Sequence, residues 1–238
     1  MPVITDTKPL ILDFTGIYAD MELERALGIP CEKLDLRHLR SVSMYVDEEA
    51  EEELSRLLVP FGYNGLHYLD NGNYHYVTRF FLRKIVSPFC LLVFDHHDDE
   101  QPPAFEGLKS CGSWIRDAKD ELGEIPGGLM KSVMTVRGRN FFTGTLAPDL
   151  PVYCSVDKDV LSESECSVNW DQGSMRLEEL KETALRLLSG RRLLGADICG
   201  ECLPENPQTK ETASALDRNR FVDVELYNFF KELMLREG

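Results

Sequence analysis

The apolar run from Phe89 to Phe94 constrains the fold more than any other stretch of this sequence. It has the length of a strand and carries no charge, which is typical of a strand buried on both faces in the middle of a parallel sheet. Asp95, His97 and Asp99 follow it and alternate, so they project on the same side of an extended segment. Ligands gather at the carboxyl ends of such strands. This segment is therefore either an acidic surface loop or a site for Mn²⁺, Zn²⁺ or Fe²⁺.

The rest of the chain alternates apolar strand-like segments with segments of helical period. We predict strands at residues 9–14, 65–69, 89–94, 131–136, 152–156 and 193–198, and helices at 21–27, 47–61, 74–85, 113–122, 177–188 and 216–235. Such alternation indicates βαβ units and a parallel sheet covered on both faces. No repeat, low-complexity tract or linker interrupts the chain, so we expect a single α/β domain over residues 1–238.

Charge and cysteine content limit the classes of partner and compartment. A net charge of −15 over 238 residues argues against nucleic acid or an anionic membrane, because both favour clusters of Lys and Arg. The seven cysteines are odd in number, and the Cys199–Cys202 pair has no second pair beside it, so free thiols in a reducing cytosol are expected. Residues 1–9 have no apolar core and no run approaches a membrane span, so we expect a cytoplasmic protein.

Polar residues follow four predicted strands, in the segments 70–75, 95–99, 157–159 and 197–201. A parallel sheet brings these strand ends to one edge. Asp157 and Asp159 form a second alternating pair, which adds to Asp95, His97 and Asp99. His75 lies just past the strand predicted at 65–69. The alternative is three unrelated solvated loops, but carboxylates gathered on one edge repel each other and need a cation. Four aspartates suit two metals that share bridging carboxylates.

These segments resemble motifs of the arginase and agmatinase group, the ureohydrolases, whose fold is shared with the histone deacetylases. The segment 95–99, DHHDD, is similar to the family's DAHxD motif, and 155–162, SVDKDVLS, is similar to SxDxDxxDP. The segment 72–76, GNYHY, keeps the histidine of GGDHS, and 170–174, WDQGS, resembles a glycine-containing turn. The segment 197–204 resembles DxxExxP with one extra residue before Glu201.

The resemblance implies a three-layer α/β/α sandwich, arginase-like, with a mostly parallel central sheet and two Mn²⁺ ions, Zn²⁺ or Fe²⁺ being alternatives. The implied metal ligands are His75, Asp95, His97, Asp99, Asp157 and Asp159. Asp95 and Asp157 would bridge the two ions. Members of the family often form trimers or hexamers, so a homo-oligomer is compatible with the resemblance.

The resemblance also implies hydrolysis of a guanidinium by water activated between two metals. Asp99 would accept a proton from that water. Glu201 would orient the guanidinium as a bidentate acceptor, its alternative being an ordinary loop acid. Cys111 stands where the family carries a proton-shuttle histidine in an HG segment; it would act as an acid, base or ligand, or simply line the pocket as a small buried residue.

We therefore expect a binuclear manganese-dependent hydrolase that cleaves a C–N bond in a small guanidino, amidino or amide compound. Arginase activity itself is not expected, because the loop after residue 99 lacks the Asn and Ser pattern with which arginases hold arginine. One alternative is a one-metal, zinc-dependent amide hydrolase resembling the deacetylases. The other is an arginase-like protein that binds metal without catalysis, and the missing shuttle histidine favours it.

Overall fold

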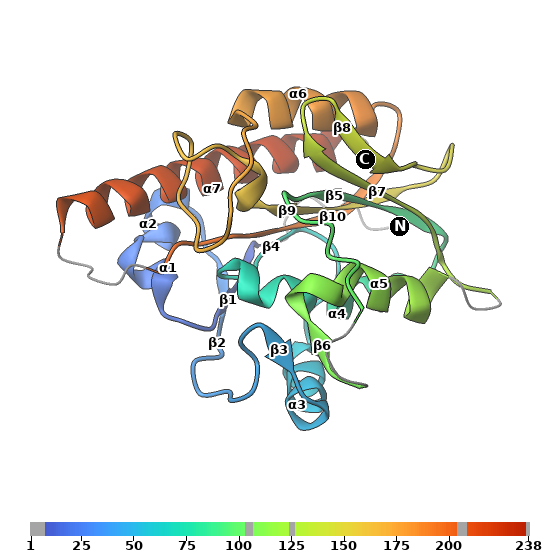
Figure 1. Cartoon of the computed structure of the whole chain (residues 1–238), viewed down its shortest axis with the longest axis horizontal. Coiled ribbons are helices and arrows are strands. Elements are labelled where there is room, and N and C mark those ends of the chain that lie inside the picture. The colour runs from blue at the N-terminus through green and yellow to red at the C-terminus, as the bar shows by residue number, and fades with distance from the viewer. Residues whose placement is uncertain (1–7, 103–106, 124–126, 204–208, 237–238) are drawn as a thin grey trace.

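The computed structural model describes residues 8–102, 107–123, 127–203 and 209–236. Its strands are β1 (Leu10–Asp13), β2 (Glu32–Asp35), β3 (Tyr45–Val46), β4 (Leu66–Tyr68), β5 (Phe89–Phe94), β6 (Lys109–Ser110), β7 (Met130–Gly138), β8 (Phe141–Gly144), β9 (Val152–Asp157) and β10 (Leu193–Cys199). Eight of them form one sheet in the order β2-β1-β4-β10-β9-β5-β7-β8, and β3 pairs with β6 (Figure 1). Within the large sheet only β7 and β8 pair antiparallel. The predicted mostly parallel sheet is confirmed.

Helices cover both faces of this sheet (Figure 1). One layer contains α1 (Ile17–Asp20), α2 (Leu23–Leu27), α6 (Leu177–Leu188) and α7 (Lys210–Arg236), and the other contains α3 (Glu48–Leu58), α4 (Thr78–Leu82) and α5 (Trp114–Ala118). The described residues also contain four short helical turns: η1 (Gly72–Val77), η2 (Cys111–Ser113), η3 (Lys119–Gly123) and η4 (Lys158–Val160). None of the described helices is both long and apolar enough to cross a bilayer. The three-layer α/β/α arrangement is confirmed.

Strand β5 explains why the sheet is buried on both sides. Its side chains alternate between the two cores, and all six are fully buried. Cys90, Leu92 and Phe94 pack with α6 and α7, whereas Phe89, Leu91 and Val93 pack with α3, α4 and α5. Each such apolar side chain contributes roughly 1.5–3 kcal/mol when it leaves water. The apolar run therefore places β5 inside the sheet and its carboxyl end at the centre of one edge.

The model departs from the predicted elements mainly at the margins of the sheet. Strands β2 and β8 were not predicted, because edge strands with exposed faces lack an apolar run: β2 is Glu-Lys-Leu-Asp. The helix predicted at 74–85 begins instead as the turn η1, which carries His75. Parts of the segments between the predicted elements, at 103–106 and 204–208, lie outside the described residues. None of these differences moves the strand ends that carry the polar residues.

A charged network ties the layer of α3, α4 and α5 together below the site. Glu121 accepts hydrogen bonds from Arg79 and Arg83 at 2.8 Å, and from Lys109 at 2.9 Å. Glu51 contacts the same three cations. The Arg79 side chain is fully buried and lies in α4, one turn after His75 of η1, so the network fixes the end of η1 and the start of α4 against α3 and η3. A buried guanidinium needs these carboxylates to offset its lost hydration.

We predict that Glu121→Gln lowers the free energy of unfolding by about 2 kcal/mol at pH 7, because it removes a half-buried partner of Arg79. Burial acts to raise the pKa of Glu121, but the hydrogen bond from Arg83 and the charge of Arg79 lower it to about 2. A folded pKa below the ordinary value of about 4.3 adds stability above that pH, and this stability is lost as the pH falls toward 2. Urea unfolding of both proteins at pH 7, 5 and 3 measures the difference.

Glu232→Gln is the matched control, because Glu232 pairs with Arg236 on the exposed surface of α7. Its effect on the free energy of unfolding should stay below about 0.5 kcal/mol at every pH. An effect of Glu121→Gln as small as that of the control at pH 7 would contradict a stabilising role for the buried network.

Candidate metal centre

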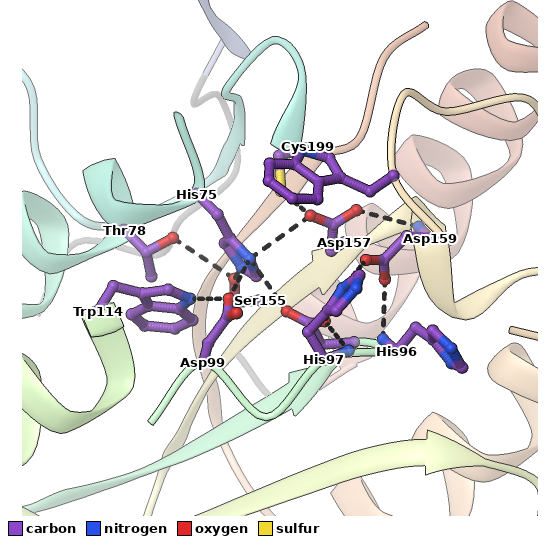
Figure 2. A network of polar contacts seen from close by, with 12 residues as sticks. His75, Thr78, His96, His97, Asp99, Trp114, Ser155, Asp157, Asp159 and Cys199 are labelled. Carbon is purple, nitrogen blue, oxygen red and sulfur yellow. Dashed lines mark hydrogen bonds and ion pairs between the residues drawn. The ribbon is translucent and has the colours of Figure 1, made fainter. Parts of the chain in front are cut away.

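The carboxyl ends of β4, β5 and β9 bring the six expected ligands together (Figure 2). Asp95 follows β5, Asp157 ends β9, and His75 lies in η1 after β4. The side chains form overlapping clusters whose ligand atoms lie within 4.8 Å of one another. These clusters are His75–Asp95–Asp99, Asp95–His97–Asp159 and His75–Asp157–Cys199. Asp95 is shared by the first two clusters, as a bridging carboxylate requires.

The first cluster is centred on Nδ1 of His75. This nitrogen lies 3.2 Å from Oδ2 of Asp95, 3.3 Å from Oδ2 of Asp99 and 3.6 Å from Oδ2 of Asp157. His75 and Asp95 are each about 1 % exposed. Three carboxylates therefore converge on one imidazole nitrogen in a site almost without water.

The opposite nitrogen of the ring determines what Nδ1 offers. Nε2 of His75 lies 2.9 Å from Oγ of Ser155, and that hydroxyl donates at 2.5 Å to Asp197. Tyr153 donates to the second oxygen of Asp197. Burial raises the pKa of Asp197 to about 6, which still leaves it mainly ionised at neutral pH. Because Ser155 gives its proton to Asp197, it accepts from Nε2–H, so Nδ1 is the nitrogen that faces the carboxylates. Burial acts to lower the pKa of His75, but Cys199, Asp95 and Asp99 raise it well above its ordinary value, so Nδ1 holds a proton unless another cation takes that place.

Unpartnered atoms test whether a cation fits this site. Among the described residues, Nδ1 of His75 and Oδ2 of Asp95 are buried without a hydrogen-bond partner. A buried polar atom without a hydrogen-bond partner costs about 1–3 kcal/mol. A divalent cation satisfies both atoms at once. The oxygen and nitrogen donors are those that Mn²⁺, Zn²⁺ and Fe²⁺ accept, so the residues fit the implied metals.

The second cluster lies beside the first and nearer to solvent. Nδ1 of His97 lies 2.6 Å from Oδ2 of Asp159, and the His97 side chain is 33 % exposed. The backbone N–H of His97 donates to Asp95, and the N–H of His96 donates to Asp159. The ring of His96 points away from this cluster, in agreement with the expected alternation (Figure 2).

Burial and mutual repulsion perturb the carboxylates. Burial, and then the charges of Asp99 and Asp159, raise the pKa of Asp95 well above its ordinary value. Burial, and then Asp159, raise the pKa of Asp157 to about 6. These shifts mean that burial and the neighbouring charges oppose the ionisation of Asp95 and Asp157 when no cation is present. A bound cation would reverse that balance.

Asp99 is held in a strained but defined position. Its φ of +48° lies in the left-handed region, which is uncommon for a residue with a side chain. Oδ2 of Asp99 accepts a 2.7 Å hydrogen bond from Nε1 of Trp114, and its carbonyl accepts from the N–H of Ile115. Helix α5 therefore aims this carboxylate at His75. Strain of this kind is typical of functional sites.

A cavity of about 150 Å³ opens onto the two clusters. Its floor contains five of the six expected ligands, whereas His75 lies beneath them. Its walls are formed by Met44, Tyr45, Gly72, Gln101, Ser110, Cys111, Gly112 and Trp170. A Cβ on Gly72 would lie 3.0 Å from both Asp157 and Trp170, so a glycine keeps this wall open. The volume suits a small molecule.

Cys111 lies on the cavity wall, where the resemblance puts the shuttle histidine. Burial, and then the charge of Asp99, raise the pKa of its thiol to about 12. The thiol is therefore protonated at neutral pH, which does not suit a general base. The structure agrees with the expectation of a small residue that lines the pocket.

Glu201 is not brought to the cavity, contrary to the role that the resemblance suggested. Its side chain is fully buried, with Oε1 2.5 Å from Nζ of Lys158 and Oε2 accepting from Asn219. Asp223 of α7 holds the same Lys158 at 2.8 Å. The residue before it is Gly200, with a φ of +96°, where a Cβ would lie 2.5 Å from Asp157. This turn and the buried lysine direct Glu201 toward α7, so it is unavailable to a guanidinium.

Two contributors to the site were not expected from the sequence. Cys199, at the end of β10, donates to Oδ2 of Asp157 at 3.1 Å. Trp114 holds Asp99, as described above. Both look like ordinary core residues in the sequence. The one usable signal was the position of Cys199 at a strand end, two residues after Asp197.

Comparison with known sequences identifies one informative relative. No family model matches the chain. A protein of Thermotoga maritima described as uncharacterized is 33% identical over 201 residues, which cover 80% of this chain and 78% of that protein. An identity of this size over most of both chains establishes common family membership.

Solved structures give the fold. A variant of formiminoglutamase from Trypanosoma cruzi, solved with Mn²⁺, superposes with a TM-score of 0.61 at 12% identity, covering 95% of this chain and 94% of that one. Proclavaminate amidino hydrolase from Streptomyces clavuligerus gives 0.59 at 14%, covering 97% and 94%. Arginase from Medicago truncatula gives 0.54 at 17%, covering 94% and 87%. The chain therefore belongs to the family of the Thermotoga maritima protein and has the fold of the ureohydrolases, the arginases and formiminoglutamases, to which it is similar over its whole length and from which its sequence diverges.

Proposed function

We propose that this protein is a binuclear metal-dependent hydrolase that cleaves a C–N bond of a small amidino, formimino or amide compound. The observation that carries the proposal is the unpartnered Nδ1 of His75, which faces three carboxylates beside a second Asp–His–Asp cluster. Two of the similar structures are named for hydrolysis of amidino or formimino groups, and one was solved with Mn²⁺. Those names support the class of reaction.

In this proposal His75, Asp95, Asp99 and Asp157 hold one ion, and Asp95, His97, Asp157 and Asp159 hold the other. Mn²⁺ is the expected metal, with Zn²⁺ and Fe²⁺ as alternatives. Bound together, two divalent ions lower the pKa of a water molecule and polarise an electrophilic carbon. The protein itself supplies the position of each ligand and a partly buried cavity.

Asp99 is the residue proposed to take the proton from water. It lies on the cavity floor, and Trp114 and the left-handed backbone fix its carboxylate. Gln101, Ser110 and Tyr45 provide polar wall groups that orient a substrate by hydrogen bonds. With Glu201 buried against Lys158, neither a guanidinium nor an amidinium has a carboxylate partner at that position, so Glu201 does not select among these compounds.

A protein that binds metal without turnover is the second candidate. The buried ion pair of Glu201 and the raised pKa of the Cys111 thiol favour it, because the resemblance gives both groups catalytic roles. Metal binding and turnover are measured separately, so the two candidates give different results.

We predict that the wild-type protein binds two Mn²⁺ ions per chain in titration calorimetry. Asp95→Asn should weaken both sites by at least about a hundredfold, because loss of a shared ligand costs more than the 10–100-fold typical of outer contacts. Asp98→Asn is the matched control, since Asp98 lies in the same segment and is exposed. Equal Mn²⁺ binding by wild type and Asp95→Asn would contradict the proposed metal site.

We predict Mn²⁺-dependent release of ammonia or urea from at least one member of a panel of guanidino, amidino, formimino and amide compounds. Asp95→Asn should reduce the rate by at least about a thousandfold, because both ions are lost. Two bound ions without release from any compound would support the non-catalytic candidate instead.

We predict that Cys111→Ser keeps turnover of that compound within about threefold of wild type, because a protonated thiol does not serve as the base. The comparison uses kcat and KM between pH 6.5 and 9. A large loss of kcat with unchanged KM would assign Cys111 an acid role in proton transfer.

A further inference from the structure

Cys199 occupies a position that the proposed metal ligands do not explain. It is the last residue of β10, and in the pairing of β10 with β9 its register partner is Asp157. The Cys199 side chain is fully buried, and Sγ lies 3.1 Å from Oδ2 of Asp157. Figure 2 shows the sulfur beside Asp157 and the ring of His75. Neighbouring strands thus direct a carboxylate and a thiol to the same place.

A second observation points to a ligand at this place. Nδ1 of His75 is buried, has no hydrogen-bond partner among the described residues, and lies 3.6 Å from the same Asp157 oxygen. His75, Asp157 and Cys199 each offer one ligand atom, and these atoms lie within 4.8 Å of one another. The thiol is therefore part of a three-donor group around an unsatisfied nitrogen.

The spacing agrees with two donors on one cation. Zinc bonds of about 2.3 Å to sulfur and about 2.1 Å to oxygen, with ligand angles of about 90–109°, place the donors about 3.1–3.6 Å apart. The sulfur–oxygen distance of 3.1 Å lies in this range. The nitrogen–oxygen distance of 3.6 Å needs a ligand angle of about 120° with bonds of about 2.1 Å. The same distance is ordinary for a thiol that only donates to a carboxylate, so the experiment has to separate these cases.

We propose that Cys199 is a sulfur ligand of the ion held by His75 and Asp157, an inference that rests on the proposed metal centre. Binding breaks the S–H bond, forms a sulfur–metal bond and releases the proton to solvent, and no electron is transferred. A thiolate adds a soft donor to an otherwise hard site, which favours Zn²⁺ or Fe²⁺ over Mn²⁺. The centre is then selective for a different metal from the one that the fold alone suggests.

Cys111 provides the contrast. It also borders the cavity floor, but it belongs to none of the donor clusters among the described residues. If closeness to the cavity were enough for a cysteine to bind zinc, Cys111 would bind it. The two cysteines therefore make a matched pair of serine variants.

X-ray absorption at the zinc edge of the fully loaded wild-type protein tests the proposal without a variant. The expected spectrum requires one sulfur for every two zinc ions, at about 2.3 Å, together with nitrogen and oxygen donors. Cys199→Ser should lose this sulfur shell, and Cys111→Ser should keep it. A first shell of nitrogen and oxygen alone in wild type, or a sulfur shell that survives Cys199→Ser, overturns the proposal.

Competition between Zn²⁺ and Mn²⁺ gives a second readout. Cys199→Ser should lower the ratio of zinc affinity to manganese affinity by at least about tenfold, because a hydroxyl is a harder donor than a thiolate. An unchanged ratio overturns the sulfur ligand while leaving the metal centre in place. Failure of the wild-type protein to bind either metal stoichiometrically would instead overturn the proposed function as well.

Discussion

Three aspartates gathered around the buried Nδ1 of His75 are the constraint on which this site depends. Ser155 donates to Asp197 and accepts from Nε2–H of His75, so Nδ1 is the nitrogen that faces the carboxylates. His75 and Asp95 are about 1 % exposed, so gathering carboxylates here carries a cost that water does not relieve. The surrounding fold holds these groups together despite that cost. A divalent cation would relieve the repulsion between the carboxylates, and this relief would favour its binding.

The sheet explains how groups so far apart in sequence meet. β4, β10, β9 and β5 are neighbours in that order, and each ends at the same edge. Their cores anchor the strands on both faces, so the short polar segments beyond the strand ends have little freedom. The charged network around Arg79 fixes η1, and Trp114 fixes Asp99. The ligand positions are thus determined by packing that is remote from the site.

Local patterns in the sequence were sufficient for the parts of the structure that depend on local chemistry. The apolar run of β5 and the helical period of α6 gave both elements with correct bounds, because burial on two faces or one stripe leaves a clear pattern. The six expected ligands meet because the segments that carry them follow strands of one sheet. The edge strands β2 and β8 left no such pattern. The orientation of Glu201 depends on Lys158, Asn219 and Asp223, which are distant in sequence. In the sequence, Cys199 differs from a core cysteine only in its position at a strand end.

Anomalous scattering from crystals grown with Mn²⁺ tests the central claim most directly, because it locates each ion independently of activity. We expect two peaks about 3.5–4 Å apart, as in other two-metal sites. One should lie against His75 and Asp99 and the other against His97 and Asp159, with Asp95 between them. A first shell without His75 at either peak, or no anomalous peak at these residues, would contradict this account.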